Sequence, residues 1–162
     1  MNKFENRIIV SFEVNGKPVE LMVEPNRTLL DVLREDLGLT GVKHGCDDSN
    51  CGVCTVIMDG KAVKSCSILI GQAEGTKVTT IEGLEGENGL HPLQQAFIDE
   101  YAFQCGFCTP GIVMAAKGLL LKNPSPTHDE IAEALSGNQC RCISQYHVFN
   151  AVESVVQKVQ EG

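Results

Sequence analysis

The arrangement of the cysteines constrains the fold of this chain more than any other feature of its sequence. Eight cysteines fall into two sets of four. Because four thiolates complete one metal centre, the chain is expected to fold around two such centres. The first set consists of Cys46, Cys51, Cys54 and Cys66, and the second consists of Cys105, Cys108, Cys140 and Cys142.

The first set has the spacing C-x4-C-x2-C followed by a more distant fourth cysteine. This is the spacing of plant-type ferredoxins, in which four thiolates hold the two bridged irons of a [2Fe-2S] cluster. Gly45 and Gly52 flank the loop and allow close approach of the backbone, so that amide N–H groups can point at the sulfurs. The first set therefore predicts a one-electron carrier. The second set combines C-x2-C with a distant C-x-C, and it needs a folded scaffold to bring the pairs together.

Two other uses of eight cysteines compete with this interpretation. A disulfide framework is disfavoured because such scaffolds stabilise small secreted chains, whereas this chain has 162 residues, 43% of them hydrophobic. The chain also begins with the charges of Lys3, Glu5 and Arg7 and shows no export signal, so we expect it to stay in the reducing cytoplasm. Structural zinc stays open for the second set, because zinc takes four thiolates and favours close pairs.

Charge and hydropathy disfavour two classes of partner. The net charge is −8 and the lysines and arginines form no cluster, which argues against a nucleic-acid partner. The longest apolar stretch, near residues 112–121, is broken by Lys117 and is too short to span a membrane. No Ser-His-Asp set, P-loop or G-x-G-x-x-G fingerprint is evident, so no catalytic residue is expected. The four histidines are expected to have surface or packing roles, because four thiolates already complete each site.

A stretch rich in glycine and glutamate separates the two cysteine sets. Residues 82–89 have no apolar periodicity of either kind, as is typical of a linker. We therefore expect two cluster-binding domains, one over residues 1–84 and the other over residues 85–162.

The first half of the chain alternates strand patterns with turn residues. Asn15-Gly16 and Asp59-Gly60 can supply the positive φ angles of two tight hairpins. Thr28 is expected to cap a helix whose leucines lie on one face as far as Leu37. This half is therefore predicted to be α+β with a small mixed sheet. Its strands are expected over residues 8–14, 19–23, 55–58, 62–66 and 77–81.

The second half changes to a helical period and carries no strand patterns. Pro92 suits the first turn of one helix, Thr109-Pro110 opens another, and residues 127–130 fit a capping box. The two cysteine pairs precede the second and fourth helices, where N–H groups and the helix dipole favour a negatively charged thiolate cluster. The pattern predicts a four-helix bundle, with helices over residues 91–101 and 109–121, from residue 127, and over residues 148–159.

Three ordered motifs carry a resemblance to a known family. They are Gly45-Cys46 through Cys51-Gly52-Val53-Cys54-Thr55-Val56, then Gln104-Cys105-Gly106-Phe107-Cys108-Thr109-Pro110-Gly111, and last Gly137-Asn138-Gln139-Cys140-Arg141-Cys142. Over about residues 7–160, the chain resembles the small iron-sulfur subunit of molybdenum hydroxylases, the group of xanthine dehydrogenase, aldehyde oxidoreductase and carbon monoxide dehydrogenase. The resemblance implies a ferredoxin-like β-grasp domain followed by a four-helix bundle domain, each with one [2Fe-2S] cluster.

The resemblance also implies partners and the roles of individual residues. A large subunit would carry the molybdopterin cofactor and a medium subunit FAD, in a dimer of heterotrimers, and this chain would pass single electrons between them. The substrate of the complex would be a purine or another N-heterocycle, which is frequent in the family. The cluster near FAD would be held by Cys46, Cys51, Cys54 and Cys66. The cluster near the pterin would be held by Cys105, Cys108, Cys140 and Cys142. The pterin itself would be contacted by Gln104 and Cys142.

The sequence departs from the family pattern in two places. Ser49-Asn50 stands where many members have glycine followed by a small or acidic residue, and this change can alter hydrogen bonds to the cluster sulfurs and so the potential. Ile143-Ser144-Gln145 follows Cys142 where Thr-Gly-Tyr is usual, with Tyr146 one position late. The ligand count is the same despite both departures.

Two functions of other classes stay open. A free-standing carrier with two clusters would visit several enzymes and expose little apolar surface, whereas a dedicated subunit would leave large apolar patches when isolated. A zinc-stabilised adaptor without redox activity would be colourless and would hold two zinc ions, one for each cysteine set.

Overall fold

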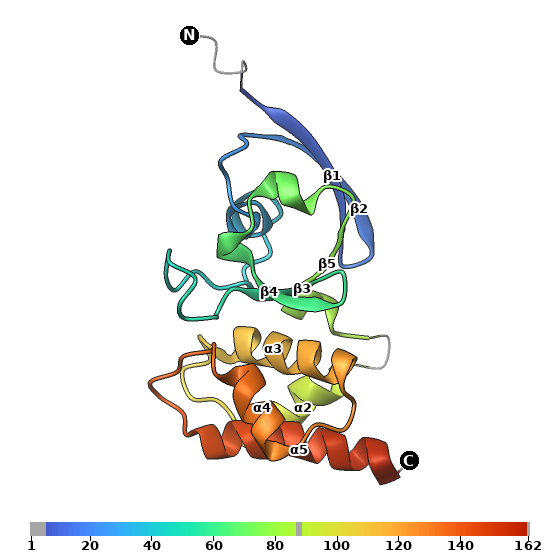
Figure 1. Ribbon diagram of the computed structural model, residues 1–162, viewed down its shortest axis with the longest axis vertical. Coiled ribbons are helices and arrows are strands. Elements are labelled where there is room, and N and C mark those ends of the chain that lie inside the picture. The colour runs from blue at the N-terminus through green and yellow to red at the C-terminus, as the bar shows by residue number, and fades with distance from the viewer. Residues whose placement is uncertain (1–5, 87–88, 162) are drawn as a thin grey trace.

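Short strands and tight turns build a five-stranded sheet in the first half of the chain. The computed structural model describes residues 6–86 and 89–161, with side chains as far as Lys158. The strand order is β2-β1-β5-β3-β4, in which β1 and β5 are parallel and the other pairs are antiparallel (Figure 1). The strands are β1 (Ile8–Val14), β2 (Lys17–Val23), β3 (Thr55–Met58), β4 (Lys61–Lys64) and β5 (Lys77–Thr79).

Both predicted hairpins are confirmed. Asn15 and Gly16 have φ angles of 50° and 77°, and Asp59 and Gly60 have φ angles of 48° and 78°. These left-handed values match the twist of the flanking strands. β4 ends two residues earlier than expected, because the hydroxyl and N–H of Ser65 both donate to the Cys54 carbonyl and begin a short 3₁₀ turn over Ser65–Ser67.

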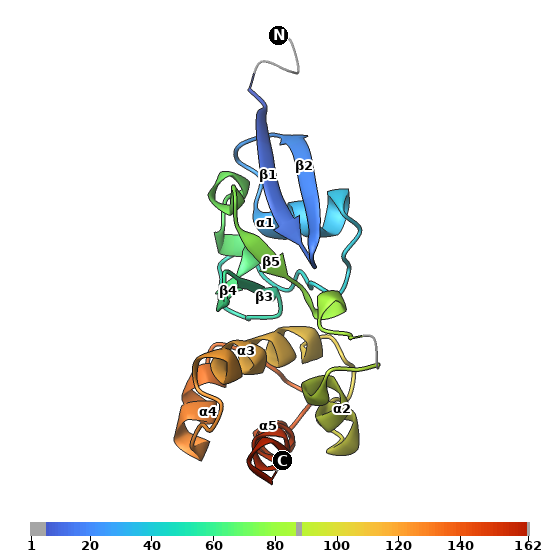
Figure 2. The ribbon, with the colours of Figure 1, turned by 90° about the vertical axis from the view of Figure 1, so that its right-hand side faces the viewer.

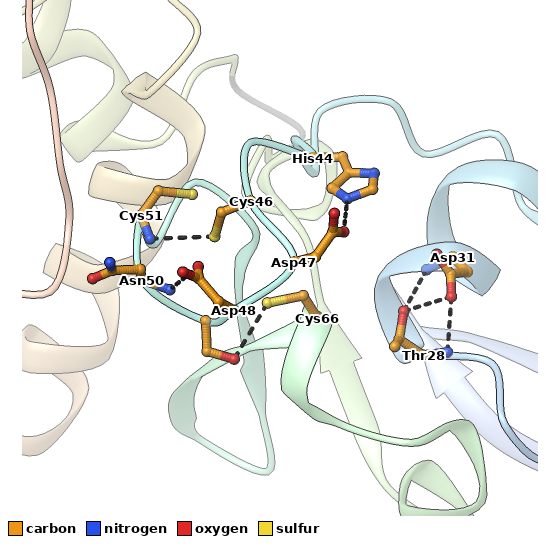
Figure 3. A network of polar contacts seen from close by, with 10 residues as sticks. Thr28, Asp31, His44, Cys46, Asp47, Asp48, Asn50, Cys51 and Cys66 are labelled. Carbon is orange, nitrogen blue, oxygen red and sulfur yellow. Dashed lines mark hydrogen bonds and ion pairs between the residues drawn. The ribbon is translucent and has the colours of Figure 1, made fainter.

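Thr28 caps the helical segment that packs on the sheet, as predicted. Its hydroxyl accepts the Asp31 N–H at 3.2 Å, and the Asp31 carboxylate accepts the Thr28 N–H at 2.9 Å (Figure 3). The expectation of one regular helix to Leu37 is wrong, however. Helix α1 covers only Leu29–Asp31, and the chain continues as a wider π-helical turn over Val32–Asp36, in which the Leu37 N–H bonds to the Val32 carbonyl.

The second half of the chain consists of four helices around a second core, as predicted. Helix α5 begins three residues earlier than expected, because the Ser144 hydroxyl accepts the Tyr146 N–H at 3.3 Å. The unusual residues after Cys142 thus start this helix. Within the described ranges, no helix is long and apolar enough to cross a membrane. The helices are α2 (Pro92–Asp99), α3 (Thr109–Lys122), α4 (His128–Leu135) and α5 (Gln145–Glu161).

Replacing Thr127 by alanine is expected to destabilise the chain by about 1 kcal/mol, because Thr127 caps α4. Its hydroxyl accepts the Glu130 N–H at 3.3 Å, and its own N–H donates to the Glu130 carboxylate at 2.7 Å. Urea unfolding at neutral pH measures the change. Ser136→Ala at the other end of the helix is the control, and an equal effect of both variants would contradict the capping role.

The same capping box predicts a pH dependence. The N–H and hydroxyl of Thr127 hold the pKa of Glu130 below its usual value of 4.5. A carboxylate with a lowered pKa contributes stability above its unfolded pKa and loses it as the pH falls. The difference in stability between the native chain and Thr127→Ala is therefore expected to be full at pH 7 and to shrink below about pH 4.5.

Helix α3 joins the two halves of the molecule. It lies against β3 and β4 on the side of the sheet that faces the other helices (Figure 2). Two glycines on one side of the helix permit this close packing. A Cβ atom on Gly111 would lie 2.4 Å from the carbonyl oxygen of Gly52, and one on Gly118 would lie 2.6 Å from the Cβ of Ala62. The loop that carries the first cysteine set therefore rests directly on α3.

Candidate iron-sulfur sites

The first site is the loop between the π-helical turn and β3, together with the turn after β4. The Cys51 N–H donates to the Cys46 sulfur at 3.4 Å, and this bond lowers the pKa of the Cys46 thiol (Figure 3). Cys54 lies beside Cys66, and Cys51 is close enough to Cys66 for a charge on Cys66 to raise the pKa of the Cys51 thiol. The structure thus brings together all four cysteines of the first set.

The cysteines of the first site differ in how deeply they are buried. Cys54 is only 2% exposed, and burial raises the pKa of its thiol to about 11. Cys46 lies near the surface next to the exposed Asp47, which binds His44 at 2.5 Å (Figure 3). The site therefore has one side in the core of the sheet and one side toward solvent.

The second site is assembled from two distant pairs, as the spacing predicts. Cys105 and Cys108 precede α3, and Cys140 and Cys142 precede α5. The sulfurs of Cys142 and Cys105 lie 3.8 Å apart, and Cys108 lies beside Cys140. Burial raises the pKa of the Cys108 thiol to about 12. The Ile143 N–H donates to the Cys140 sulfur at 3.5 Å, the same kind of contact as in the first site.

Four exposed aromatic side chains lie close in the sequence to the cysteines of the second site. Gln104, Cys105 and Cys142 are themselves exposed. Exposed apolar side chains follow or precede these residues in the chain, and Tyr101 and Tyr146 are 78% and 67% exposed. We call Tyr101, Phe103, Phe107 and Tyr146 the aromatic rim.

The two sites are in direct contact through hydrogen bonds that the sequence patterns did not predict. The Gln139 N–H donates to the Cys51 carbonyl at 2.9 Å, and the Asn138 side chain donates to the Gly52 carbonyl at 2.9 Å. Lys64 donates to the Ser49 carbonyl at 2.7 Å. Asn138 and Gly52 are 86 positions apart in the chain, so the local periodicity of the sequence cannot reveal that they are hydrogen-bonded. The loop before Cys140 is therefore fastened to the loop of the first site.

Both sites fit a [2Fe-2S] cluster by the chemistry of their donors. Each offers four thiols, and all eight cysteines are free of disulfides. Gly45 leaves room beside the first site, because a Cβ there would lie 3.1 Å from the Cys51 sulfur. Beside Cys108, the Thr109 hydroxyl is the only fully buried side-chain N or O atom of the described residues without a hydrogen-bond partner.

Other candidate ligands are engaged elsewhere or dispersed. His91 caps α2 by accepting the Leu93 N–H at 3.1 Å, and burial followed by the charge of Lys117 lowers its pKa. His128 binds Glu153 at 2.6 Å. Over residues 6–86 and 89–161, no three histidine, cysteine, aspartate or glutamate side chains surround a point as ligands of one metal ion do. A [2Fe-2S] cluster divides its four cysteines between two irons.

Comparison with known families agrees with this chemistry. The model described as "2Fe-2S iron-sulfur cluster binding domain" matches residues 12–96, and the model described as "[2Fe-2S] binding domain" matches residues 80–153. The nicotinate dehydrogenase small FeS subunit of Eubacterium barkeri is 46% identical, over 94% of this chain and 98% of its own length. The aldehyde oxidoreductase iron-sulfur-binding subunit PaoA of Escherichia coli is 39% identical, over 93% of this chain and 72% of its own.

Solved structures confirm the fold. A chain of quinoline 2-oxidoreductase from Pseudomonas putida 86 has a TM-score of 0.90 and 41% identity, and the match covers 98% of this chain and 99% of that one. The aldehyde oxidoreductase of Desulfovibrio desulfuricans also has a TM-score of 0.90, with 42% identity, over 94% of this chain but 17% of its own. This chain therefore belongs to the small iron-sulfur subunits of the molybdenum hydroxylase family, whose cofactors are two [2Fe-2S] clusters.

Proposed function

We propose that this chain relays single electrons from a molybdopterin centre in one partner subunit toward FAD in another. The observation that supports this relay is the direct hydrogen bond between the two sites. The residue before Cys140 donates its N–H to the carbonyl of Cys51, which belongs to the other site. A short bonded route between two redox centres is what a relay needs.

We assign the eight cysteines as cluster ligands in the two sets already described. When bound, the clusters supply one-electron transfer. The chain supplies the thiolates, and the N–H groups of Cys51 and Ile143 stabilise negative charge on two of their sulfurs. We also propose that the division between the two cluster-binding domains falls between residues 84 and 85.

The aromatic rim supports a large molybdopterin-binding subunit as the partner at the second site. Exposed aromatic side chains that are close in the chain to the ligands of a redox site are residues that a partner subunit can cover. Gln104 and Cys142 are exposed and are our candidates for pterin contacts. A medium FAD-binding subunit would then lie near the first site, in a dimer of heterotrimers. A free-standing shuttle would not need the rim.

The names of the relatives favour an N-heterocycle as the substrate of the complex. Nicotinate and quinoline, which two of the similar proteins are named for, are aromatic rings that contain nitrogen. We extend this class to the complex of this chain and keep a purine as one member of it. A cytoplasmic location is also proposed, since eight free cysteines suit a reducing compartment.

Metal analysis of the anaerobically purified chain tests the proposed relay. We expect about four irons and four sulfides per chain, and two distinct S = 1/2 signals in electron paramagnetic resonance after reduction by dithionite. Co-purification with a molybdenum subunit would support the dedicated partner. Two zinc ions and no signal would establish the adaptor instead, and a loaded chain that stays a monomer without partners would establish the shuttle.

A further inference from the structure

Ser49 places a hydroxyl group on a cysteine of the first site. Its oxygen lies 3.5 Å from the sulfur of Cys66, in a half-buried position. In the thiol form either atom can donate this hydrogen bond. A thiolate that holds iron has no proton, so in the loaded site the Ser49 hydroxyl is the donor.

The backbone around Ser49 is held in an unusual conformation. Ser49 has a φ angle of 60°, in the left-handed region that favours glycine. The Lys64 ammonium donates to the carbonyl of Ser49 at 2.7 Å and fixes the peptide in place. Lys64 lies two residues before Cys66, so one short segment supplies both the ammonium group that binds the Ser49 carbonyl and the sulfur that faces the Ser49 hydroxyl. The hydroxyl is therefore positioned by the fold, at a place where glycine would fit the backbone with less strain.

We infer that Ser49 is a positioning residue that raises the reduction potential of the cluster in the first site. This inference rests on the proposed assignment of Cys66 as a cluster ligand. Reduction adds one negative charge to the cluster, and a hydrogen bond to a ligand sulfur stabilises that charge more strongly in the reduced state. Loss of the hydroxyl therefore makes the cluster harder to reduce.

Three variants of the complete complex test this role. Ser49→Ala removes the hydroxyl and keeps the Cβ atom, whereas Ser49→Gly removes the hydroxyl and also relieves the positive φ angle. Ser67→Ala is the matched control, because Ser67 also neighbours Cys66 but donates its hydroxyl to the Lys64 carbonyl at 2.8 Å. Both Ser49 variants are expected to fold, and Ser49→Gly preserves the test if Ser49→Ala does not.

A redox titration followed by electron paramagnetic resonance measures the effect. Both Ser49 variants are expected to shift the reduction equilibrium of the first site about threefold to tenfold toward the oxidised form, which is about 28 to 59 mV for one electron. The reduction potential of the second site is expected to stay unchanged in the Ser49 variants. In Ser67→Ala, the potentials of both sites are expected to stay unchanged. The hyperfine coupling of the cluster in the first site to the exchangeable proton of the Ser49 hydroxyl is expected to disappear in both Ser49 variants.

The outcomes separate this inference from the proposed function. Unchanged potentials in Ser49→Ala and Ser49→Gly, with both cluster signals present, would overturn the role of Ser49 and leave the relay intact. A shift of equal size in Ser67→Ala would also overturn it, because the effect would then follow from any change near Cys66. Absence of both cluster signals from the native complex would instead reject the relay itself.

Discussion

Replacing Cys108 by serine is expected to remove the cluster of the second site and to leave that of the first site in place. Cys108 is buried beside Cys140, and burial raises the pKa of its thiol to about 12, so this sulfur lies in the interior of its site. A serine hydroxyl at this position is a poor substitute for the soft thiolate that iron-sulfur clusters take as ligand. Cys54→Ser is the reciprocal variant, because Cys54 is the buried member of the first site.

Iron content and electron paramagnetic resonance measure the loss. Each variant is expected to keep about two of four irons and one of the two S = 1/2 signals, with a different signal missing in each. The two variants control for each other, since general damage to the chain would remove both signals from both. If both variants kept two intact clusters, the ligand assignment would be wrong. The pair also identifies which signal belongs to the first site, as the titration of the Ser49 variants requires.

Local features of the chain were predictable because local chemistry dictates them. Asn15-Gly16 and Asp59-Gly60 adopt positive φ angles, which few other residue pairs permit, so the two hairpins follow from the residues themselves. Thr28 and Thr127 cap their helices through bonds to residues three positions away. The short cysteine spacings, C-x4-C-x2-C and C-x2-C, were informative for the same reason, because neighbouring ligands of one cluster are only a few residues apart.

Apart from the meeting of the two cysteine pairs of the second site, features that depend on contact between distant segments were not predictable. The apolar pattern after Thr28 indicates a helix but does not distinguish an α-helix from a π-helix. In the structure, Val32 and Leu33 pack into the core of the sheet domain and belong to a π-helical turn. Asn138 belongs to the third motif and Lys64 to none, and the motif did not predict that both side chains donate to carbonyl groups on loops that the fold places beside them. The Ser49 departure was visible in the sequence, whereas its bond to Cys66 needed the fold.

Replacing Gly111 by alanine is expected to loosen the contact between the cysteine loop and α3. The added methyl group would lie 2.4 Å from the Gly52 carbonyl oxygen and 2.7 Å from the Cα of Val53, and both are backbone atoms that cannot rotate away. Overpacking of this kind costs about 1 to 3 kcal/mol, and the better helix propensity of alanine offsets about 1 kcal/mol of it. Because both contacts are with backbone atoms, we expect a cost in the upper part of this range and a net loss of about 1 to 2 kcal/mol in the free energy of unfolding.

Two other glycines make this prediction specific. Gly86→Ala is the control, because a Cβ there meets nothing within 4 Å. Gly118→Ala is expected to cost less than Gly111→Ala, since its neighbour is the Cβ of the exposed Ala62 on the edge strand β4. Urea unfolding of the three variants gives the order. Gly52 and Val53 lie between two cysteines of the first site, so displacement by Gly111→Ala is also expected to alter the resonance signal of that site. Equal stability of Gly111→Ala and Gly86→Ala would show that α3 does not support the cysteine loop.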